Sequence, residues 1–349
     1  MPDTLPILAY DAQDLAWDRL AERGTHFLGC RTPILGGAMS WVSERHLVSA
    51  ISNAGGFGVI AAGSMGPDLL AEEIRATQLR TDAPFGVNLI TFHPEIEALV
   101  DVCLAAGVSH IVLAGAMPSS ALLRHVRTGA RAICFASALP IARRLIRMGA
   151  DALVIEGCEA GGHIGPVSLA VLAQEILPEI HEVPVFVAGG IGRGEAMVAF
   201  MQMGAAGAQL GSRFAAACES IAHPRFKQAF INARARDAMP SIQLDPAFPV
   251  IPVRGLINRG TSRFVTHQAE MAAAVRNGTM TREAAQLAIE HFWAGGLRRA
   301  VIDGDVEDGS VMAGQSVGMV TREQPAADII AELLEQARAA LRRSRPAGP

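Results

Sequence analysis

Short, uninterrupted runs of apolar residues recur at fairly even spacing along the first two thirds of the chain. There are eight of them, at Thr32–Leu35, 58–62, 85–89, 110–115, 132–137, 152–157, 184–190 and 207–212. Each run is continuous and does not alternate between apolar and polar residues. This pattern indicates strands that are buried on both faces, as in a parallel sheet covered by helices.

The stretches between these runs carry apolar residues at helical spacing, as in SERHLVSAISNAG, PDLLAEEIRATQLR, SALPIARRLIRMGA and GEAMVAFMQMGA. A strand–helix unit that is repeated eight times predicts an α/β protein built as a (β/α)8 TIM barrel. An open doubly wound sheet is the alternative. It is disfavoured because the first run is not followed by a G-x-G-x-x-G turn and because the repeats number eight.

The alternation breaks after GSRF at 211–214, where the chain becomes more polar and largely helical. We interpret 1–218 as the main part of the barrel, 219–309 as a helical lid inserted between the last strand and the last barrel helix, and 310–349 as a return loop and that final helix. Within the insertion, FPVIPVRGLINRGTS is expected to form irregular connecting structure. An insertion here would lie over the C-terminal face of the barrel, where barrel active sites form. A helical module packed elsewhere is the alternative.

The composition argues against several classes of protein. Half of the 349 residues are apolar and 18% are charged, which predicts a large core. The net charge of −4 gives no basic surface for nucleic acid, and no apolar run is long enough for a membrane span. The five cysteines contain no C-x-x-C pair, so neither a disulfide framework nor a structural zinc site is expected. With no signal-peptide pattern at the start, a reducing, cytoplasmic location is predicted.

Two glycine-rich loops follow the last two runs, within AGGIGRGE and GSRF. Backbone N–H groups can approach an anion closely where no Cβ intervenes. The loops after the seventh and eighth strands of such barrels are also the usual phosphate site. The residues concerned are Ala188, Gly189, Gly190, Gly211 and Ser212. They predict a ligand that carries a phosphate group.

Two further residues lie at the same predicted mouth. Met39, in LGGAMSW, brings a flexible thioether, and Asn88 brings an amide that both donates and accepts hydrogen bonds. A planar heteroaromatic ring with one phosphate, such as flavin mononucleotide (FMN), would suit this set. Taken singly, Asn88 as a turn cap and Met39 as a core residue are equally good interpretations.

Longer motifs carry a resemblance to a known family. PILGGAMSWV, SNAGGFGVI, APFGVN, EGCEAGGHIG, VPVFVAGGIGRGE, GAQLGSRF and DGSVMAGQSVGMV together resemble the nitronate monooxygenase superfamily over roughly residues 28–340. The chain is most similar to the FMN-dependent enoyl-[acyl-carrier-protein] reductase branch, particularly in GDVEDGSVMAGQSVG. Two positions depart from that branch. The first loop has GGAM where the reductases tend to have QGGM, and Leu113 and Ala114 replace common hydroxyl residues.

The resemblance implies a TIM barrel with FMN and assigns roles by motif. Gly37, Ala38 and Met39 would line the flavin ring, Asn88 would bond to it, and Glu156, Gly161 and Gly162 would contact the cofactor. Ala188, Gly189, Gly190, Gly211 and Ser212 would hold the phosphate. NADH or NADPH is implied as a co-substrate that binds transiently at the open flavin face. The resemblance also implies a monovalent cation bound by carbonyls of the lid loops, a small or acyl-carrier-bound substrate, and a homodimer.

His163 is the candidate catalytic residue. Its flanking glycines let the backbone turn sharply and aim the ring toward the flavin, and an imidazole takes or gives a proton near neutral pH. In an enoyl reductase it would help to protonate the substrate; in a nitronate monooxygenase it would act as a base. No second histidine or carboxylate lies at ligand spacing in the motif, so a metal site is not expected. An ordinary loop histidine, or a flavin-holding protein without turnover, is the alternative.

Four other features complete the predicted site. Glu159 is a candidate to orient His163, although a solvated loop carboxylate is the equal alternative. His223 is expected to cap a helix. Arg254 is a candidate contact for a phosphate, with an ordinary surface arginine as the default. The apolar, glycine-rich SVMAGQSVG at 310–318 is expected to return over the cofactor mouth.

Overall fold

The computed structural model describes residues 12–343. Eight parallel strands form one sheet: β1 (Ile34–Gly36), β2 (Gly58–Ala61), β3 (Phe85–Ile90), β4 (His110–Ala114), β5 (Arg131–Phe135), β6 (Ala152–Glu156), β8 (Val185–Ala188) and β9 (Gly207–Leu210). Their order is β1-β9-β8-β6-β5-β4-β3-β2. The ring closes because Leu35 and Phe57 form a parallel bridge between its two ends. The predicted (β/α)8 barrel is confirmed, and each strand overlaps one of the apolar runs.

Successive residues of these strands belong to two different hydrophobic clusters. Leu35, Val59 and Val154 pack with one another inside the barrel. Ile34 and Ile60 belong instead to the larger cluster between the sheet and the surrounding helices. Because both faces of each strand are buried, the runs are continuous and carry no polar alternation.

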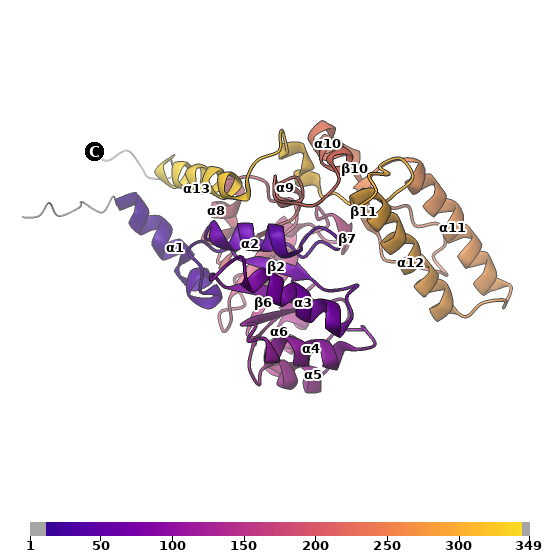
Figure 1. Cartoon of the computed structure of the whole chain (residues 1–349), viewed down its shortest axis with the longest axis horizontal. Helices are drawn as coiled ribbons and strands as arrows, with labels where there is room; N and C mark the ends of the chain where they lie inside the picture. The colour runs from indigo at the N-terminus through magenta and orange to yellow at the C-terminus, as the bar shows by residue number, and fades with distance from the viewer. Residues whose placement is uncertain (1–11, 344–349) are drawn as a thin grey trace, which may run out of the picture.

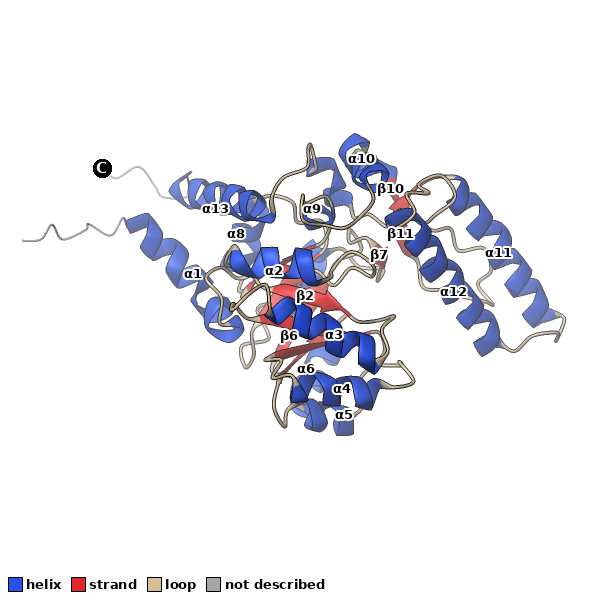
Figure 2. Cartoon of the chain, in the orientation of Figure 1, coloured by secondary structure: helices blue, strands red, loops and turns tan. Residues whose placement is uncertain are grey.

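A ring of helices surrounds the strands, which lie at the centre of the barrel in Figure 2. After the strands come α2 (Arg45–Asn53), α3 (Pro67–Gln78), α4 (Ile96–Ala105), α5 (Ser120–Val126), α6 (Leu139–Met148), α7 (Leu169–Ile176) and α8 (Gly194–Gln202). The last helix, α13 (Ala326–Arg343), packs against α8 and α2 and so completes the ring, as predicted. Within residues 12–343, no helix has both the length and the apolar character needed to span a bilayer.

An additional helix, α1 (Ala12–Leu28), closes the end of the barrel where the strands begin. The Phe27 carbonyl accepts hydrogen bonds from His110 Nε2 and Arg131 Nη1, both at 2.9 Å. A Cβ at Gly24 would lie 2.0 Å from the Ala206 oxygen, so only glycine permits this close approach of helix to strand. With this end sealed by α1, the opposite end of the barrel is left for the functional loops.

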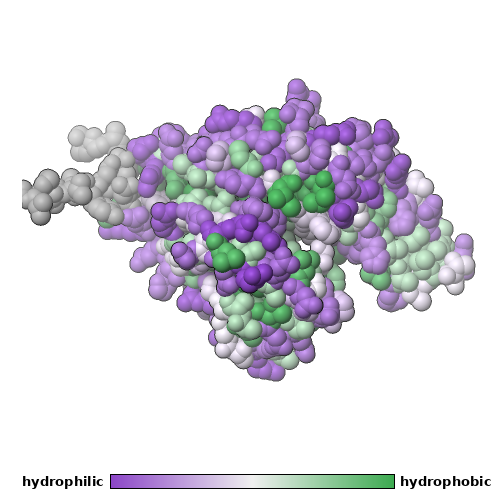
Figure 3. Space-filling view, in the orientation of Figure 1, coloured by the Kyte–Doolittle hydropathy of each residue, from purple (hydrophilic) through white to green (hydrophobic). Residues whose placement is uncertain are grey.

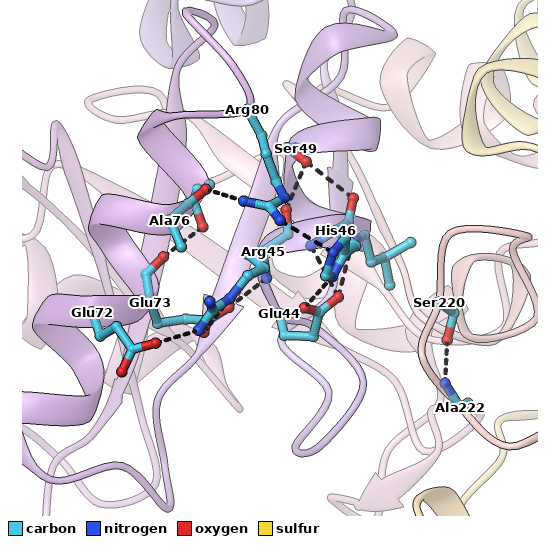
Figure 4. A network of polar contacts seen from close by, with 12 residues as sticks. Glu44, Arg45, His46, Ser49, Glu72, Glu73, Ala76, Arg80, Ser220 and Ala222 are labelled. Atoms are coloured by element: carbon cyan, nitrogen blue, oxygen red, sulfur yellow. Dashed lines mark hydrogen bonds and ion pairs between the residues drawn. The ribbon is translucent and has the colours of Figure 1, made fainter.

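A polar network ties α2 to α3 near the first of those loops (Figure 4). Glu44 caps α2 by accepting from the backbone N–H groups of His46 and Leu47. Arg45 donates from Nε to Glu73 Oε2 at 2.9 Å. The Glu73 side chain is only 5% exposed, so the carboxylate of this ion pair is shielded from solvent. The network therefore anchors the base of the loop that follows β1.

The predicted insertion begins after a short helix, α9 (Ser212–Ala215). It contains α10 (Pro224–Asn232), β10 (Ala238–Pro240), β11 (Val253–Leu256), α11 (Arg259–Arg276) and α12 (Arg282–Val301). The helices α11 and α12 pack together and project from one side of the molecule (Figure 1 and Figure 3). We refer to them as the helical hairpin. They share a hydrophobic core of their own, which includes Phe264, Ile289 and Trp293.

The expectation of irregular structure throughout FPVIPVRGLINRGTS is wrong in part. Residues 253–256 within it form β11, which pairs antiparallel with β10 and with the two-residue strand β7 (Gly162–His163). The physical reason is that one partner, β7, lies some 90 residues earlier in the chain, where local pattern gives no sign of it, and the other, β10, has only three residues. This small sheet joins the insertion to the loop that carries His163.

Candidate active site

The loop after β1 is held in shape by Ser43. The Ser43 hydroxyl donates to the Gly37 carbonyl at 2.8 Å and accepts from the Met39 N–H at 3.0 Å. Ser43 itself is buried. Trp41 in this loop has a φ of 66°, a left-handed conformation that a tryptophan rarely adopts. The loop therefore has a defined shape at the mouth, and Ser43 is a supporting residue that sequence reasoning missed.

The predicted phosphate loops touch their neighbours around the mouth. Gly189 and Gly190 have φ values of 94° and 70°, which glycine adopts at no steric cost. A Cβ at Gly189 would lie 2.8 Å from the Gly157 oxygen, so the loops after β8 and β6 are in close contact. A Cβ at Gly211 would lie 3.7 Å from Met39 Sδ, which places the loop after β9 beside the first loop.

The segment at 310–318 passes over these loops, as its composition predicted. The Gly314 N–H donates to Ser212 Oγ at 3.1 Å, and the Gln315 N–H donates to the Glu159 carbonyl at 2.9 Å. A Cβ at Gly161 would lie 2.6 Å from the Gly314 nitrogen. The return loop thus ties the loop after β9 to the EAGGHIG loop.

Asn88 lies in the C-terminal half of β3, and Glu156 is the last residue of β6. Asn88 is buried and donates from Nδ2 to the Val112 carbonyl at 3.2 Å, which leaves its Oδ1 for another partner. Glu156 lies in register with Ala188 of β8. Burial raises the pKa of the Glu156 carboxyl to about 7, because a charged carboxylate is poorly solvated there. Near neutral pH this group is therefore able to donate or to accept a hydrogen bond.

These loops suit a phosphate-bearing planar group. Glycines follow β8 and β9, and the small residues Gly37 and Ala38 follow β1. The Glu156 carboxyl and the uncommitted oxygen of Asn88 add polar groups from two other strands. The twelve residues predicted to bind the cofactor thus lie at strand ends or in loops on the same face of the barrel.

His163 lies in β7, directly after Gly162, whose φ is 80°. Its ring Nε2 is 3.0 Å from Glu290 Oε2 on α12, and the two side chains are 42% and 38% exposed. β7 lies between the barrel and the helical hairpin (Figure 1). The sharp turn at Gly162 agrees with the sequence. The ring contact, however, is with the hairpin, and no feature of the sequence pointed to Glu290.

The structure confirms one of the three other residue predictions and contradicts two. Glu159 does not orient His163, because its carboxylate accepts the Leu169 N–H at 3.0 Å at the start of α7. His223 caps α10 as predicted, accepting the Arg225 N–H at 3.1 Å. Arg254 is not a surface residue. It is buried and donates from Nε to the Cys158 carbonyl at 2.8 Å, which fastens β11 to the loop after β6.

The sequence and the structure of this chain are similar to those of known FMN-dependent oxidoreductases. The sequence pattern of the family described as nitronate monooxygenase matches residues 22–336. The structure is similar to FabK from Thermotoga maritima, with a TM-score of 0.81, 35% identity and coverage of 92% of this chain and 97% of that one. It is also similar to nitroalkane oxidase from Streptomyces ansochromogenes, with a TM-score of 0.74, 27% identity and coverage of 92% and 99%.

A curated sequence relative has a thioester in its name. It is (3aS,4S,5R,7aS)-5-hydroxy-7a-methyl-1-oxo-octahydro-1H-indene-4-carboxyl-CoA dehydrogenase from Mycobacterium tuberculosis. It is 28% identical to this chain over 334 residues, which cover 86% of this chain and 92% of the relative. The similarity in each comparison extends through the barrel and the insertion.

Proposed function

The chain belongs to the nitronate monooxygenase family of FMN-dependent oxidoreductases, and we propose that it reduces the carbon–carbon double bond of an enoyl thioester with NADH or NADPH. The observation that carries the proposal is the similarity to FabK, an enoyl-[acyl-carrier-protein] reductase, at 35% identity over 92% of this chain. The CoA-thioester relative from Mycobacterium tuberculosis supports the same substrate class.

In this proposal, the loops at the mouth would hold the cofactor and supply the proton. Gly189, Gly190, Gly211 and Ser212 would hold the phosphate with backbone N–H groups and a hydroxyl. The loop after β1, which Ser43 holds in shape with two hydrogen bonds, would support the flavin ring together with Asn88. When bound, FMN supplies the hydride-transfer chemistry, and the protein supplies orientation and electrostatics.

His163 would supply the proton in this reaction. Reduction of an enoyl thioester adds a hydride at the β-carbon and a proton at the α-carbon. The imidazole is partly exposed, and its Nε2 lies 3.0 Å from a carboxylate oxygen of Glu290. We assign His163 as the general acid of the proposed reduction.

An anaerobic absorbance experiment tests the proposal. The purified holoprotein is mixed with NADH or NADPH, and separately with an alkyl nitronate, while the flavin band is followed. We expect rapid bleaching by the dinucleotide and return of the colour on addition of an enoyl-CoA. Bleaching by the nitronate alone would favour a nitronate monooxygenase and overturn the proposal. Bleaching by the dinucleotide that no enoyl thioester reverses would also overturn it, as would failure to bind FMN.

A further inference from the structure

The loop after β8 is fastened at two backbone groups by side chains from later in the chain. The Arg213 guanidinium donates from Nη1 to the Gly192 carbonyl at 2.8 Å. Two residues further on, the Gly194 N–H donates to Gln336 Oε1 of α13 at 2.9 Å. One carbonyl and one N–H group, on either side of Arg193, are therefore held in fixed directions.

Arg213 is held in turn by a buried polar network. Its side chain is 3% exposed, and Nη2 donates to Glu332 Oε2 at 3.0 Å and to Gln324 Oε1 at 3.3 Å. Glu332 also accepts from Gln324 Nε2 at 3.1 Å and from Gln336 Nε2 at 3.0 Å. Burial opposes ionisation of Glu332, but the hydrogen bonds from Gln324 and Arg213 outweigh it and lower the pKa of the carboxyl. The guanidinium therefore has a charged partner and a fixed orientation at neutral pH.

Backbone donors of the same loop are left without a partner. Among residues 12–343, no acceptor is bonded to the N–H groups of Gly190, Gly192 and Arg193. Gly192 is buried, and a buried N–H group without a partner is rare in a folded protein. An anion is the kind of ligand that satisfies several N–H groups at once, and a phosphate therefore fits this loop.

The bond from Arg213 determines which way the peptide between Gly192 and Arg193 faces. This peptide is trans, so its C=O and its N–H point in opposite directions. The carbonyl is directed at the Arg213 guanidinium, and the Arg193 N–H consequently points away from it. Without that bond, the peptide is free to turn its carbonyl, an acceptor, toward an anion in place of a donor.

We propose that Arg213 is a positioning residue for the phosphate of FMN and acts through the Gly192 peptide. It holds the Gly192 carbonyl away from the phosphate and so keeps N–H donors of the loop available to it. Arg213 directly follows Gly211 and Ser212, so a single residue couples the loop after β9 to the loop after β8. The assignment rests on the proposed function, in which these two loops hold the phosphate.

Titration of the flavin-free full chain with FMN and with riboflavin tests the proposal. Riboflavin has the same ring and lacks the phosphate, so the ratio of the two dissociation constants reports on the phosphate site. Quenching of flavin fluorescence is followed for the parent protein, Arg213→Gln, Arg213→Lys and the control Arg143→Gln. Arg143 is 50% exposed and forms a surface ion pair with Glu179, which is also 50% exposed.

The expected result is a loss of affinity that is specific to the phosphate. We expect the parent protein to bind FMN at least about a hundredfold more tightly than riboflavin, because hydrogen bonds to a charged phosphate are strong. In Arg213→Gln that preference should fall about tenfold or more, while the dissociation constant of riboflavin stays within about twofold of the parent value. Arg213→Lys should keep part of the preference, since an ammonium group lacks the planar fork that reaches all three acceptors. Arg143→Gln should keep all of it.

Two outcomes separate positioning from general support of the fold. An unchanged preference for FMN in Arg213→Gln would overturn the proposal, and so would an equal loss of affinity for both flavins. Where Arg213→Gln does not fold, the double variant Arg213→Gln/Glu332→Gln takes its place, because it leaves no unpaired charge buried. A parent-like preference for FMN in the double variant would overturn the proposal as well.

The proposed reaction and the role of Arg213 fail in different ways. The titration needs neither a thioester nor a dinucleotide. A reduced preference for FMN in Arg213→Gln, with no enoyl turnover in the parent protein, would overturn the reaction and leave the role of Arg213 standing. Enoyl turnover in the parent protein, with an unchanged preference in Arg213→Gln, would overturn the role of Arg213 alone. A parent protein that binds FMN and riboflavin equally well would overturn the phosphate site and, with it, the role of Arg213.

Discussion

At the scale of single residues, His163 shows most directly which features of the site the sequence predicts and which it does not. The glycines around it are read from the sequence, and the positive φ of Gly162 in the structure agrees with a sharp turn there. The ring partner, by contrast, comes from a helix far along the chain. A residue type and its local backbone are predictable from a motif, whereas a partner brought in by tertiary packing is not.

Replacing His163 with alanine is expected to leave FMN binding intact and to slow the substrate half-reaction by about 10² or more, the usual scale for a lost acid or base. The flavin spectrum of the variant checks cofactor binding, and stopped-flow absorbance measures the half-reaction with enoyl-CoA. A half-reaction as fast as in the parent protein would make His163 an ordinary loop histidine.

Glu156 is expected to make stability depend on pH. Burial raises the pKa of its carboxyl from 4.5 to about 7, so between these values the folded state holds a proton that the unfolded state has lost. Its contribution to stability is therefore present below about pH 4.5 and is lost as pH rises toward 7. Glu156→Gln should remove this dependence in urea unfolding of the flavin-free protein between pH 5 and 8.

A matched control for Glu156 is the exposed residue Glu97 in the first turn of α4. Glu97→Gln should keep the pH dependence of the parent protein. If Glu156→Gln retains the same fall in stability with pH as Glu97→Gln, then burial of Glu156 is not its cause.

At the scale of elements, the barrel strands were predictable because each is buried on two faces and so stands out as an apolar run. The strands β7, β10 and β11 were not, because each has four residues or fewer and because the pairing of β11 with β7 joins segments far apart in the chain. The helix α1 lies before the first apolar run and outside the repeat that the sequence displays. Short elements fixed by tertiary pairing are thus the part that pattern alone misses.

The Arg45–Glu73 pair offers a test of how α2 and α3 are joined. Glu73→Ala removes a carboxylate that is 5% exposed, whereas Glu72→Ala removes one that is 56% exposed and reaches Arg45 only at 3.5 Å. We expect a loss of about 2 to 3 kcal/mol in the free energy of unfolding for Glu73→Ala and under about 1 kcal/mol for Glu72→Ala. Chemical denaturation measures both. Equal losses would show that burial of Glu73 does not strengthen this pair.

At the scale of the whole molecule, the chain has two hydrophobic centres of different size. The barrel and its helices share the large one, and the helical hairpin has its own, which includes Ile289. The overall barrel and the existence of an insertion were predictable from where the alternation stops. Its position at the C-terminal face was also predicted, whereas the pairing of β11 with β7 that joins it to the His163 loop was not.

Ile289→Ala is expected to loosen the hairpin and leave the barrel intact. Ile289 is almost fully buried, and such a truncation costs about 2 to 5 kcal/mol within the unit that contains it. Hydrogen–deuterium exchange should become faster in α11 and α12 by about tenfold or more, with the barrel strands unchanged. A uniform increase over both regions would indicate one cooperative unit.

The packing of α1 against α13 has a consequence for synthesis of the chain. Trp17 and Ala21 of this helix are buried, and α1 packs against α13, the last helix described. During synthesis α1 therefore lacks part of its binding surface until α13, far along the chain, has also been made. Until then part of its apolar face is uncovered, and the growing chain exposes apolar surface that a chaperone can bind.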